Sequence, residues 1–548
     1  MALVASGAIA FSDVNVELGF SSSATIALND AAVRALAGVA SGAISLSNFY
    51  GKVNAFHQAI TWTHGTSILQ SYRNLNHRLD SSGNFEVVQI NTNSATGPSI
   101  WKFNSSGTLL SGKLTTFTYN GAAATFEGPT LPIARYDNDG NLYFLHGWPG
   151  VLNANYGKGP FIARFAASDR SCTYATWHNV SFIGPAPNGA GVQPMGLSVG
   201  NNSLYYAADS YQYYKSGYTY GPEGEQIDVI SYVFHYNVQR FLSANGTWDW
   251  GKKVNLTAGS PASLTSNSIP WCPSGGAVLA SNSSFDSVFL PATVSTTSGE
   301  RPFIVKYNQN GEMLGASFYT GTFSGNITSG NQQDGASPVL DSSGNLIVVY
   351  KTSQNPVMLK IDSSLNPVWG KTISDASWSP GSGIYGLAVD ASDNIYLIAE
   401  IGSNAIDLMK LNSSGTPQFN YHIYSQSNGA AMSTSYFNGL SVQGSSLSIN
   451  MRQQFNGGSN TYYHNTILSL PTAGITANTF SLNNANTGST PTNTLVIGDY
   501  MGVIAVSTIT WTRVNPSSSN TSWYDAYHSS TTVQATANIT TLSAFTSI

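Results

Sequence analysis

Residues 341–350, Asp-Ser-Ser-Gly-Asn-Leu-Ile-Val-Val-Tyr, decide the fold of this chain. Gly and Asn tolerate the left-handed backbone of a tight reversal, and the Asp side chain accepts hydrogen bonds from the turn. The apolar run Leu346–Tyr350 is typical of a strand that is covered on both faces. The stretch therefore predicts a hairpin turn followed by an internal strand.

The same combination of turn and strand recurs along the chain. Each copy continues through a variable stretch to a second strand, which ends in Lys or Arg, an apolar residue and another polar turn. Clear copies begin at Asp80, Asp137, Asp341 and Asp390, and weaker copies begin at Asn201, Ser287 and Gly444. About seven copies with a period on the order of 50 residues match four-stranded propeller blades. The sequence predicts an all-β fold, a β-propeller of about seven blades.

The composition agrees with a folded protein made mostly of strands. Of 548 residues, 41% are hydrophobic and 12% aromatic, so the chain can bury a large core. Only 9% are charged, against roughly a quarter in ordinary soluble domains. Surface helices need charged residues, whereas Ser, Thr and Asn can solvate sheets and turns. Helix should be scarce.

The first 52 residues differ from the repeats. Residues 11–19 alternate apolar with polar and predict a strand, and residues 26–38 predict a short helix with Asn29 or Asp30 as N-cap and Gly38 as its end. So few residues bury little surface alone, which indicates a small strand/helix module that docks onto something larger. The expected docking residues are Phe11, Val14, Val16, Leu18, Val33, Leu36, Phe49 and Tyr50.

Residues 11–19, 26–34 and 41–52 together resemble the opening segment of virion and tail-associated proteins of many tailed phages, notably marine and cyanobacterial ones. The resemblance implies a docking element that binds other virion proteins, and a chain that is made in the host cytoplasm and assembled into a virion, on the tail more than on the capsid. The alternative is an ordinary N-terminal strand and helix packed on the main domain. The repeats resemble bacterial propeller repeats, which carry no single activity.

Three parts of the chain follow from these patterns. Residues 1–52 form the docking module, 53–513 the propeller-like repeat domain, and 514–548 a Ser/Thr-rich C-terminal segment that completes or decorates it. Within the particle we expect a homo-oligomer.

An insertion between Tyr205 and Tyr220 is unusually rich in tyrosine. Such loops offer rigid amphipathic area that stacks on sugars and hydrogen-bonds their hydroxyls. The expected receptor-binding residues are Tyr211, Tyr213, Tyr214, Tyr218 and Tyr220. The alternative is that these rings pack on a neighbouring blade or on a partner subunit.

Motifs for other chemistry are weak. Residues 137–141, Asp-Asn-Asp-Gly-Asn, look like part of a calcium loop but lack its distal Glu, so turn chemistry is favoured. The histidines show no metal-ligand spacing, and Cys172 and Cys272 are expected to be free thiols rather than a disulfide. No nucleophile elbow, phosphate loop or dinucleotide fingerprint occurs. The sequence thus predicts neither a metal nor a cofactor, and no enzymatic activity.

The function expected from sequence is that of a phage structural protein of the tail, of tail-fibre, baseplate or adhesin type. It would act in virion assembly, in binding a host surface glycan, or in both. A net charge of −5 disfavours nucleic acid, and no apolar run is long enough to insert into a membrane. The alternatives are a capsid decoration protein and a virion-borne glycan-degrading enzyme.

Overall fold

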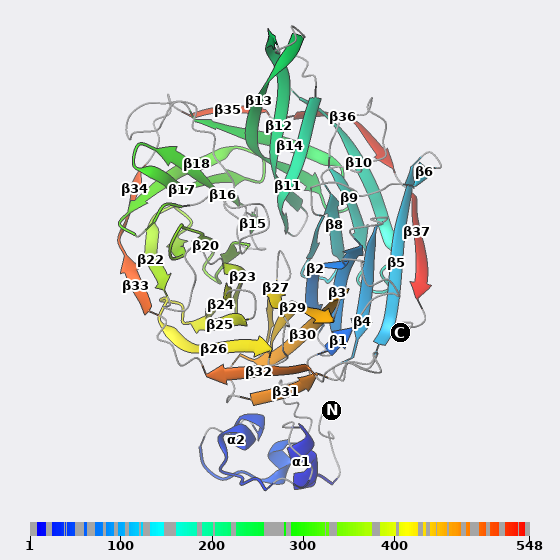
Figure 1. Ribbon diagram of the computed structural model, residues 1–548, viewed down its shortest axis with the longest axis vertical. Helices are drawn as coiled ribbons and strands as arrows, with labels where there is room; N and C mark the ends of the chain where they lie inside the picture. The colour runs from blue at the N-terminus through cyan, green and yellow to red at the C-terminus, as the bar shows by residue number, and fades with distance from the viewer. Residues whose placement is uncertain are drawn as a thin grey trace.

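The structure is a computed structural model of the chain, and it describes residues 8–17, 23, 25–37, 39, 41–49, 60–62, 72–80, 84–91, 97–104, 109–119, 122–123, 132–146, 160–182, 189–200, 203–220, 226–256, 279–280, 287–323, 325–327, 337–374, 384–401, 405–425, 431–434, 439–444, 446–457, 460–472, 478–482, 493–499, 505–514, 521–525, 527–534 and 536–542. These residues form seven antiparallel sheets, arranged as the blades of a ring (Figure 1). The predicted β-propeller is confirmed.

Blades 1 to 3 are built from consecutive strands that run from the centre of the ring outward. Blade 1 contains β2 (Tyr72–Leu79), β3 (Phe85–Asn91), β4 (Pro98–Phe103) and β5 (Leu109–Tyr119), with the short β6 (Ala122–Ala123) beside β5. Blade 2 contains β7 (Ile133–Tyr136), β8 (Leu142–His146), β9 (Phe161–Phe165) and β10 (Cys172–Phe182). Blade 3 contains β11 (Gly189–Val199), β12 (Ser203–Tyr220), β13 (Gln226–Leu242) and β14 (Trp248–Leu256).

Blades 4 to 6 repeat this order, and blade 7 varies it. Blade 4 contains β15 (Leu279–Ala280), β16 (Ser287–Thr296), β17 (Gly299–Asn308) and β18 (Met313–Gly321). Blade 5 contains β19 (Val339–Leu340), β20 (Leu346–Tyr350), β21 (Val357–Ile361) and β22 (Pro367–Ser374). Blade 6 contains β23 (Ile384–Val389), β24 (Ile395–Ile401), β25 (Ala405–Leu411) and β26 (Pro417–Ser425). In blade 7, β27 (Ala431–Thr434) and β28 (Leu440–Gln443) both pair with β29 (Ser446–Gly457), and β30 (Asn460–Pro471) follows.

Both ends of the repeat region contribute outer strands. β1 (Ile60–Trp62) pairs with β30, so the first strand completes the last blade and closes the ring. The C-terminal strands then add a further outer strand to each remaining blade, in the reverse of chain order, and we call them the belt. They are β32 (Asn493–Asp499) on blade 6, β33 (Ala505–Ile509) on blade 5, β34 (Trp511–Val514) on blade 4, β35 (Thr521–Asp525) on blade 3, β36 (Tyr527–Gln534) on blade 2 and β37 (Thr536–Leu542) on blade 1. β31 (Asn478–Leu482) pairs with β32 (Figure 1).

An Asp–Asn pair holds the turn between the first two strands of four blades. In blade 5, the Asp341 carboxylate accepts hydrogen bonds from the backbone N–H and the side-chain amide of Asn345, both at 2.8 Å. The corresponding pairs are Asp80–Asn84, Asp137–Asn141 and Asp390–Asn394. In blades 5 and 6 the residue before Asn has a positive φ, which suits Gly344 at 77° but strains Asp393 at 61°. The Asp393 carboxylate accepts bonds from the backbone N–H and hydroxyl of Ser342 in blade 5, which offsets this strain.

Apolar side chains fill the spaces between blades. All five residues of β8 and of β20 are buried, as expected for strands covered on both faces. One cluster joins Ile347 and Met358 of blade 5 to Leu397 and Met409 of blade 6. The core therefore consists of layers between neighbouring blades.

Polar contacts, which we call turn clasps, reinforce these layers. In each clasp a side chain of one blade donates to a backbone carbonyl in the second polar turn of the next blade, or just after β30 in blade 7. The clasps are Lys113 to Asp169, Tyr174 to Ser243, Trp250 to Gln309, Lys306 to Ser363, Tyr319 to Leu365, Lys360 and Trp369 to Ser413, and Lys410 to Thr472. The clasps connect blades 1 to 7 in sequence, and in blades 4 to 6 they use the basic residue that ends the repeat, Lys306, Lys360 and Lys410.

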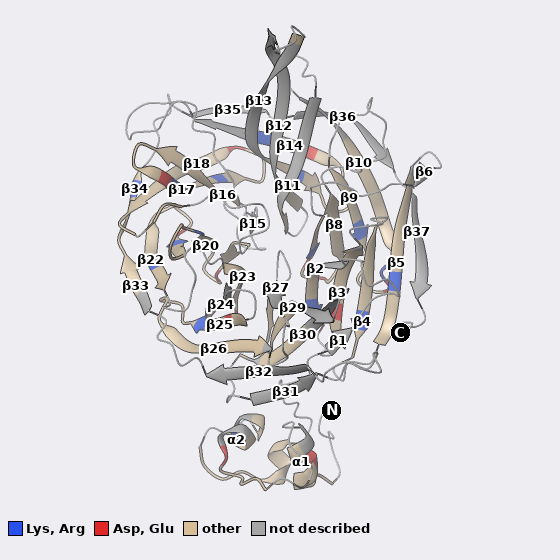
Figure 2. Cartoon of the chain, in the orientation of Figure 1, with Lys and Arg blue, Asp and Glu red and all other residues tan. Residues whose placement is uncertain are grey.

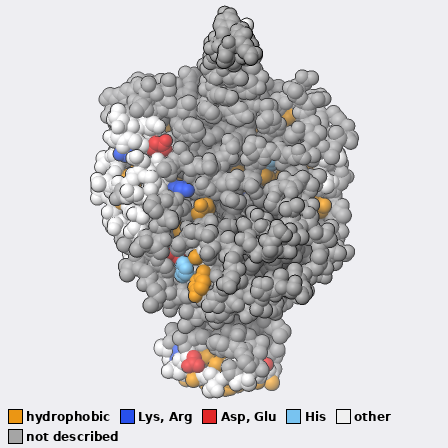
Figure 3. Space-filling view, in the orientation of Figure 1, with side chains coloured by type: hydrophobic (Ala, Val, Ile, Leu, Met, Phe, Trp, Pro, Cys, Tyr) orange, Lys and Arg blue, Asp and Glu red, His pale blue; other side chains and the backbone are white. Residues whose placement is uncertain are grey.

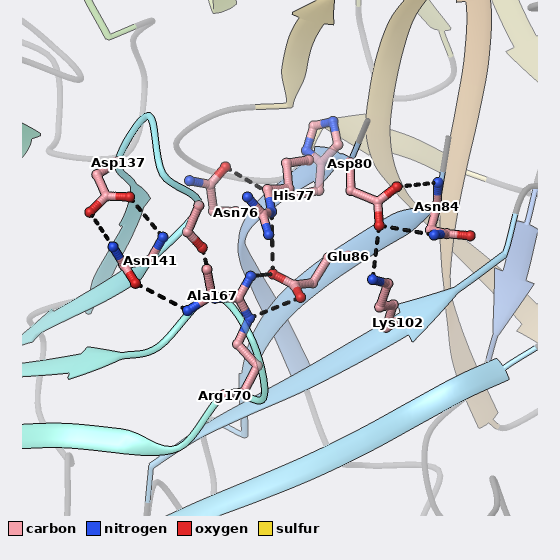
Figure 4. Close-up of polar contacts among 12 residues, drawn as sticks. Asn76, His77, Asp80, Asn84, Glu86, Lys102, Asp137, Asn141, Ala167 and Arg170 are labelled. Carbon is pink, nitrogen blue, oxygen red and sulfur yellow. Dashed lines mark hydrogen bonds and ion pairs between the residues drawn. The ribbon is translucent and has the colours of Figure 1, made fainter. Parts of the chain in front are cut away.

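The interface between blades 1 and 2 also contains a buried ion pair (Figure 4). The Arg170 Nε and Nη2 atoms of blade 2 lie 2.9 and 2.6 Å from the two carboxylate oxygens of Glu86 on β3. Arg170 and Glu86 are only 6% and 4% exposed. The Nη1 atom of Arg170 donates to the Gly140 carbonyl at 2.8 Å. The guanidinium thus ties the turns of blade 2 to a strand of blade 1.

The N-terminal residues fold into a helical module outside the ring, beyond β31 in Figure 1. It contains α1 (Phe11–Glu17), α2 (Ala31–Ala37) and the 3₁₀ helix η1 (Leu46–Phe49). The predicted strand at residues 11–19 is wrong. The Asp13 carboxylate accepts the Ala10 N–H at 2.8 Å while the Val14 N–H donates to the Ala10 carbonyl, which starts a helix. The helix predicted within residues 26–38 is confirmed as α2, and the Asp30 carbonyl accepts the Arg34 N–H, as an N-cap residue does.

Candidate functional site

The tyrosines expected to bind a receptor lie on a long hairpin. β12 and β13 extend beyond the ring at blade 3 (Figure 1). Tyr211, Tyr213, Tyr214, Tyr218 and Tyr220 all belong to β12, so they occupy a strand where the sequence indicated a loop. In backbone register Tyr213 pairs with Tyr232 and Tyr218 with Asp228. Their side chains lie outside the described part of the structure.

The expected docking residues divide into two groups. Val14, Val33, Leu36 and Phe49 form the core of the helical module and are at most 6% exposed, so they face inward. Phe11 is 42% exposed, and Leu46 of η1 is 39% exposed. Figure 3 shows apolar side chains at the surface of this module. The side chain of Val16, and Leu18 and Tyr50 altogether, lie outside the described residues.

The calcium-like stretch behaves as a turn, as expected. The Asp137 carboxylate accepts bonds from the Asn141 backbone N–H at 2.7 Å and from its side-chain amide at 2.8 Å. The Tyr143 hydroxyl reaches the same carboxylate at 3.3 Å. Among the residues that the structure describes, no group of three or more His, Cys, Asp or Glu is placed to hold a metal ion. Cys172 is a free thiol whose pKa burial raises to about 12, and Cys272 lies outside the described residues.

Among the residues that the structure describes, charged side chains are spread over the blades without one large region of a single sign (Figure 2). Within the described part of the chain, no helix is long and apolar enough to cross a membrane. The polar groups that merit attention are therefore individual pairs rather than an extended charged surface.

A carboxylate–imidazole pair on blade 6 is the strongest candidate for chemistry. Asp407 on β25 and His422 on β26 are directly opposite each other in the antiparallel register. The Nδ1 atom of His422 lies 2.8 Å from Oδ1 of Asp407. The Asp407 side chain is 1% exposed, whereas that of His422 is 28% exposed. A buried carboxylate thus orients an imidazole that reaches the surface.

The position of this pair follows from strand alternation. Asp407 shares a strand face with Met409 and Leu411, both of which belong to the apolar cluster between blades 5 and 6. The pair therefore faces blade 5. The His422 ring packs against the Tyr424 ring, with centroids 5.3 Å apart. Because an aspartate can only accept, Nδ1 is the protonated nitrogen of the neutral ring, and the lone pair is on Nε2. Such an imidazole can take up a proton from a bound molecule.

The polar cluster between blades 1 and 2 has a different character. The Tyr136 ring lies near two guanidinium groups, at 4.6 Å from that of Arg78 and 5.6 Å from that of Arg170. Arg78 also lies 3.5 Å from Glu86. Burial raises the pKa of Tyr136 well above its usual value, so its hydroxyl stays protonated. Because Glu86 and Arg170 are already bonded to each other, this cluster is suited to holding blades together.

Asp407 and His422 were not predicted from the sequence, although a signal was present. The turn at Asn412–Gly415 predicts a hairpin, but counting outward from it places Asp407 opposite Tyr421, because a β-bulge between Lys410 and Leu411 shifts the pairing by one residue to His422. A carboxylate inside the apolar run Ala405–Leu411 is unusual, because a buried charge needs a partner.

Comparisons with known proteins find similar structures but no matching sequence. No protein-family model matches the chain, and no curated protein matches its sequence. The structure is similar to a polysaccharide lyase, an ulvan lyase, with 10% identity over 75% of this chain and 97% of that one, at a TM-score of 0.36. It is also similar to a mutant of the NanB sialidase from Streptococcus pneumoniae, with 11% identity over 78% of this chain and 73% of that one, at a TM-score of 0.33.

A third similar structure is a protein of unknown function from Dyadobacter fermentans, with 9% identity over 62% of this chain and 94% of that one, at a TM-score of 0.32. The lyase and the sialidase overturn the expectation that the chain is not an enzyme, because both are glycan-processing enzymes.

Proposed function

We propose that this protein is a glycan-processing enzyme in which His422 transfers a proton. The observation that carries the proposal is the partly exposed imidazole fixed by the buried Asp407 carboxylate at 2.8 Å. Asp407 is a positioning residue, because it acts through His422 by fixing the tautomer and ring orientation. A neutral imidazole held in this way suits abstraction of a carbon-bound or hydroxyl proton from a sugar.

The aromatic surroundings agree with a sugar ligand. Tyr424 lies beside His422, and aromatic rings stack on the apolar faces of sugar rings while hydroxyl groups bond to their edges. The low content of charged residues, 9%, suits contact with long hydroxyl-rich polymers through Ser, Thr, Asn and Tyr.

Incubation of the full chain with neutral, uronate-containing and sulfated polysaccharides tests this function. Newly formed reducing ends measure cleavage, and ultraviolet absorbance of an unsaturated uronate separates elimination from hydrolysis. His422→Gln should lower the rate roughly 100-fold or more, since general acid–base groups contribute about 10²- to 10⁴-fold. Asp407→Asn should lower kcat more than KM and change the pH profile. Lys306→Met on blade 4 is the control, and full activity in His422→Gln would contradict the assignment.

The helical module supports a second proposal, that the chain is attached to a virion. The module has its own core, and the exposed Phe11 and Leu46 side chains offer an apolar contact for another virion protein. With the glycan proposal, this corresponds to a virion-borne glycan-degrading enzyme. Phe11→Glu combined with Leu46→Glu should abolish incorporation into purified particles while leaving glycan cleavage intact. Unchanged incorporation would count against docking through these residues.

A further inference from the structure

An arginine at the centre of the ring has an unusual set of partners. Arg135 lies on β7, the innermost strand of blade 2. Its Nη1 atom donates to the carbonyl of Ala134 at 2.8 Å, and its Nη2 atom donates to the hydroxyl of Ser337 at 2.9 Å. Ser337 lies two residues before β19, the innermost strand of blade 5. Blades 2 and 5 are not neighbours in the ring, so this bond spans its centre.

Both acceptors of Arg135 are neutral. Within the described part of the chain, no carboxylate forms an ion pair with this guanidinium. Desolvation by the surrounding protein lowers the pKa of Arg135 to about 10, so the group remains charged near neutral pH. A cation taken out of water without a counter-ion is destabilising, and proteins normally pair it or use it to bind an anion.

Two other arginines of this ring, Arg170 and Arg240, have carboxylate partners, whereas Arg301 and Arg513, like Arg135, donate to neutral acceptors. Arg170 makes two bonds to Glu86, and Arg240 contacts Asp249. Arg135 is instead held by the Ala134 carbonyl, which also accepts the Asn76 side-chain amide at 3.0 Å. The bond to the Ala134 carbonyl holds Nη1 in place, and Nη2 points toward Ser337 of blade 5.

We propose that Arg135 binds an anionic group of the substrate, a carboxylate or a sulfate ester of a sugar, at the centre of the ring. The planar guanidinium fork matches two oxygens of such a group, and the Ser337 hydroxyl supplies a further donor on the opposite side. The assignment of the anion to a glycan rests on the proposed function, whereas an anion site at Arg135 does not. The substrate class is then an acidic polysaccharide.

Binding of defined polymers to the full-length protein tests this site. Dextran and dextran sulfate share one backbone and differ in sulfate, and polygalacturonate supplies carboxylates. At constant ionic strength, calorimetry should show that the protein prefers one or both acidic polymers to dextran. Arg135→Gln should weaken that binding roughly 10- to 100-fold, as expected for a charge-assisted pair. Preference for dextran sulfate assigns a sulfate ester, and preference for polygalacturonate assigns a carboxylate.

Arg301→Gln is the matched control, because Arg301 also donates to backbone carbonyls, those of Glu300 and Ser298, but lies on β17. It should leave binding unchanged. Arg135→Lys keeps the charge without the fork and should give intermediate affinity, which keeps the test informative if Arg135→Gln does not fold. Equal affinity of the wild type and both Arg135 variants would overturn the site.

Separate measurements distinguish a failure of catalysis by His422 from a failure of anion binding by Arg135. His422→Gln should bind acidic polymers normally without cleaving them. If the wild-type protein cleaves no glycan, inorganic sulfate still tests Arg135. A larger rise in Tm for the wild type than for Arg135→Gln, at equal sulfate concentration, supports the anion site by itself. An equal rise in both proteins refutes it.

Discussion

Neighbouring blades are held together by different polar groups in two parts of the ring, the interface between blades 1 and 2 and the interfaces from blade 4 to blade 7. In the first, Arg170 faces the Glu86 carboxylate with two bonds, and both groups are buried. In the others, Lys306, Lys360 and Lys410 each reach one backbone carbonyl of the next blade. A backbone carbonyl is present whatever the side chain, so the lysine clasps tolerate variation in the partner turn. The ion pair does not, because either group alone would be a buried charge.

Removal of Arg170 should destabilise the protein more than any other change at these interfaces. Arg170→Met should lower the free energy of unfolding by about 3–5 kcal/mol, because Glu86 loses its bidentate partner in a buried site. Urea unfolding gives the value. The double variant Arg170→Met with Glu86→Leu should recover much of the loss, and additive losses in the two single variants would show that the pair is not coupled.

Acid should affect the interface of blades 2 and 3 through a neutral histidine. His178 is fully buried against the Phe241 ring, and burial lowers its pKa from 6.5 to about 4. Between these values the unfolded chain binds a proton that the folded chain does not, so stability falls as pH falls. The loss should approach roughly 3 kcal/mol near pH 4. Urea unfolding from pH 7 to pH 4 should show a smaller loss in His178→Gln. The same loss in the variant and the wild type would contradict this origin.

Two lysine clasps of unequal burial should contribute unequally to stability. Lys360 also pairs with the buried Asp341 at 2.7 Å, whereas Lys306 bonds to the Ser363 carbonyl. Lys360→Met should lower the free energy of unfolding by about 2 kcal/mol, because the buried Asp341 loses its ion pair and keeps only its bonds to Asn345. Lys306→Met should lower it by about 1 kcal/mol. Chemical denaturation of both variants measures the difference. A larger loss in Lys306→Met would contradict the role assigned to Asp341.

The smallest effect is expected at Asp393. Asp393→Gly relieves a φ of 61° but removes the bonds to Ser342. These effects oppose each other, so the change in unfolding free energy should stay within about 1 kcal/mol. Asp393→Ala keeps the strain and loses the bonds, so it should be the less stable variant. If thermal unfolding shows Asp393→Ala to be as stable as the wild type, the contact between blades contributes nothing.

The propeller could be predicted because its turns are local. An Asp and an Asn four residues apart define the reversal between the first two strands of four blades, as at Asp137–Asn141. The strand expected at residues 11–19 was wrong because the Asp13 capping bond outweighs an alternation that also fits a helix. A carboxylate within an apolar run could have indicated Asp407, but its partner His422 could not be found by counting from the turn, because a β-bulge shifts the register by one residue. Arg135 and Ser337 could not be paired from the sequence either, since they meet only when the ring closes.

The belt also determines the order in time in which the protein can be completed. The first repeat to leave the ribosome, blade 1, receives its outermost strand from β37, where Leu542 pairs with Gly112. Every other blade except blade 7 likewise waits for a strand made after all the blades. During synthesis, the outer edges of blades 1 to 6 therefore remain open to wrong pairing. The chain finishes its earliest structure last, and a nascent chain that stops short of β37 leaves blade 1 without its outermost strand.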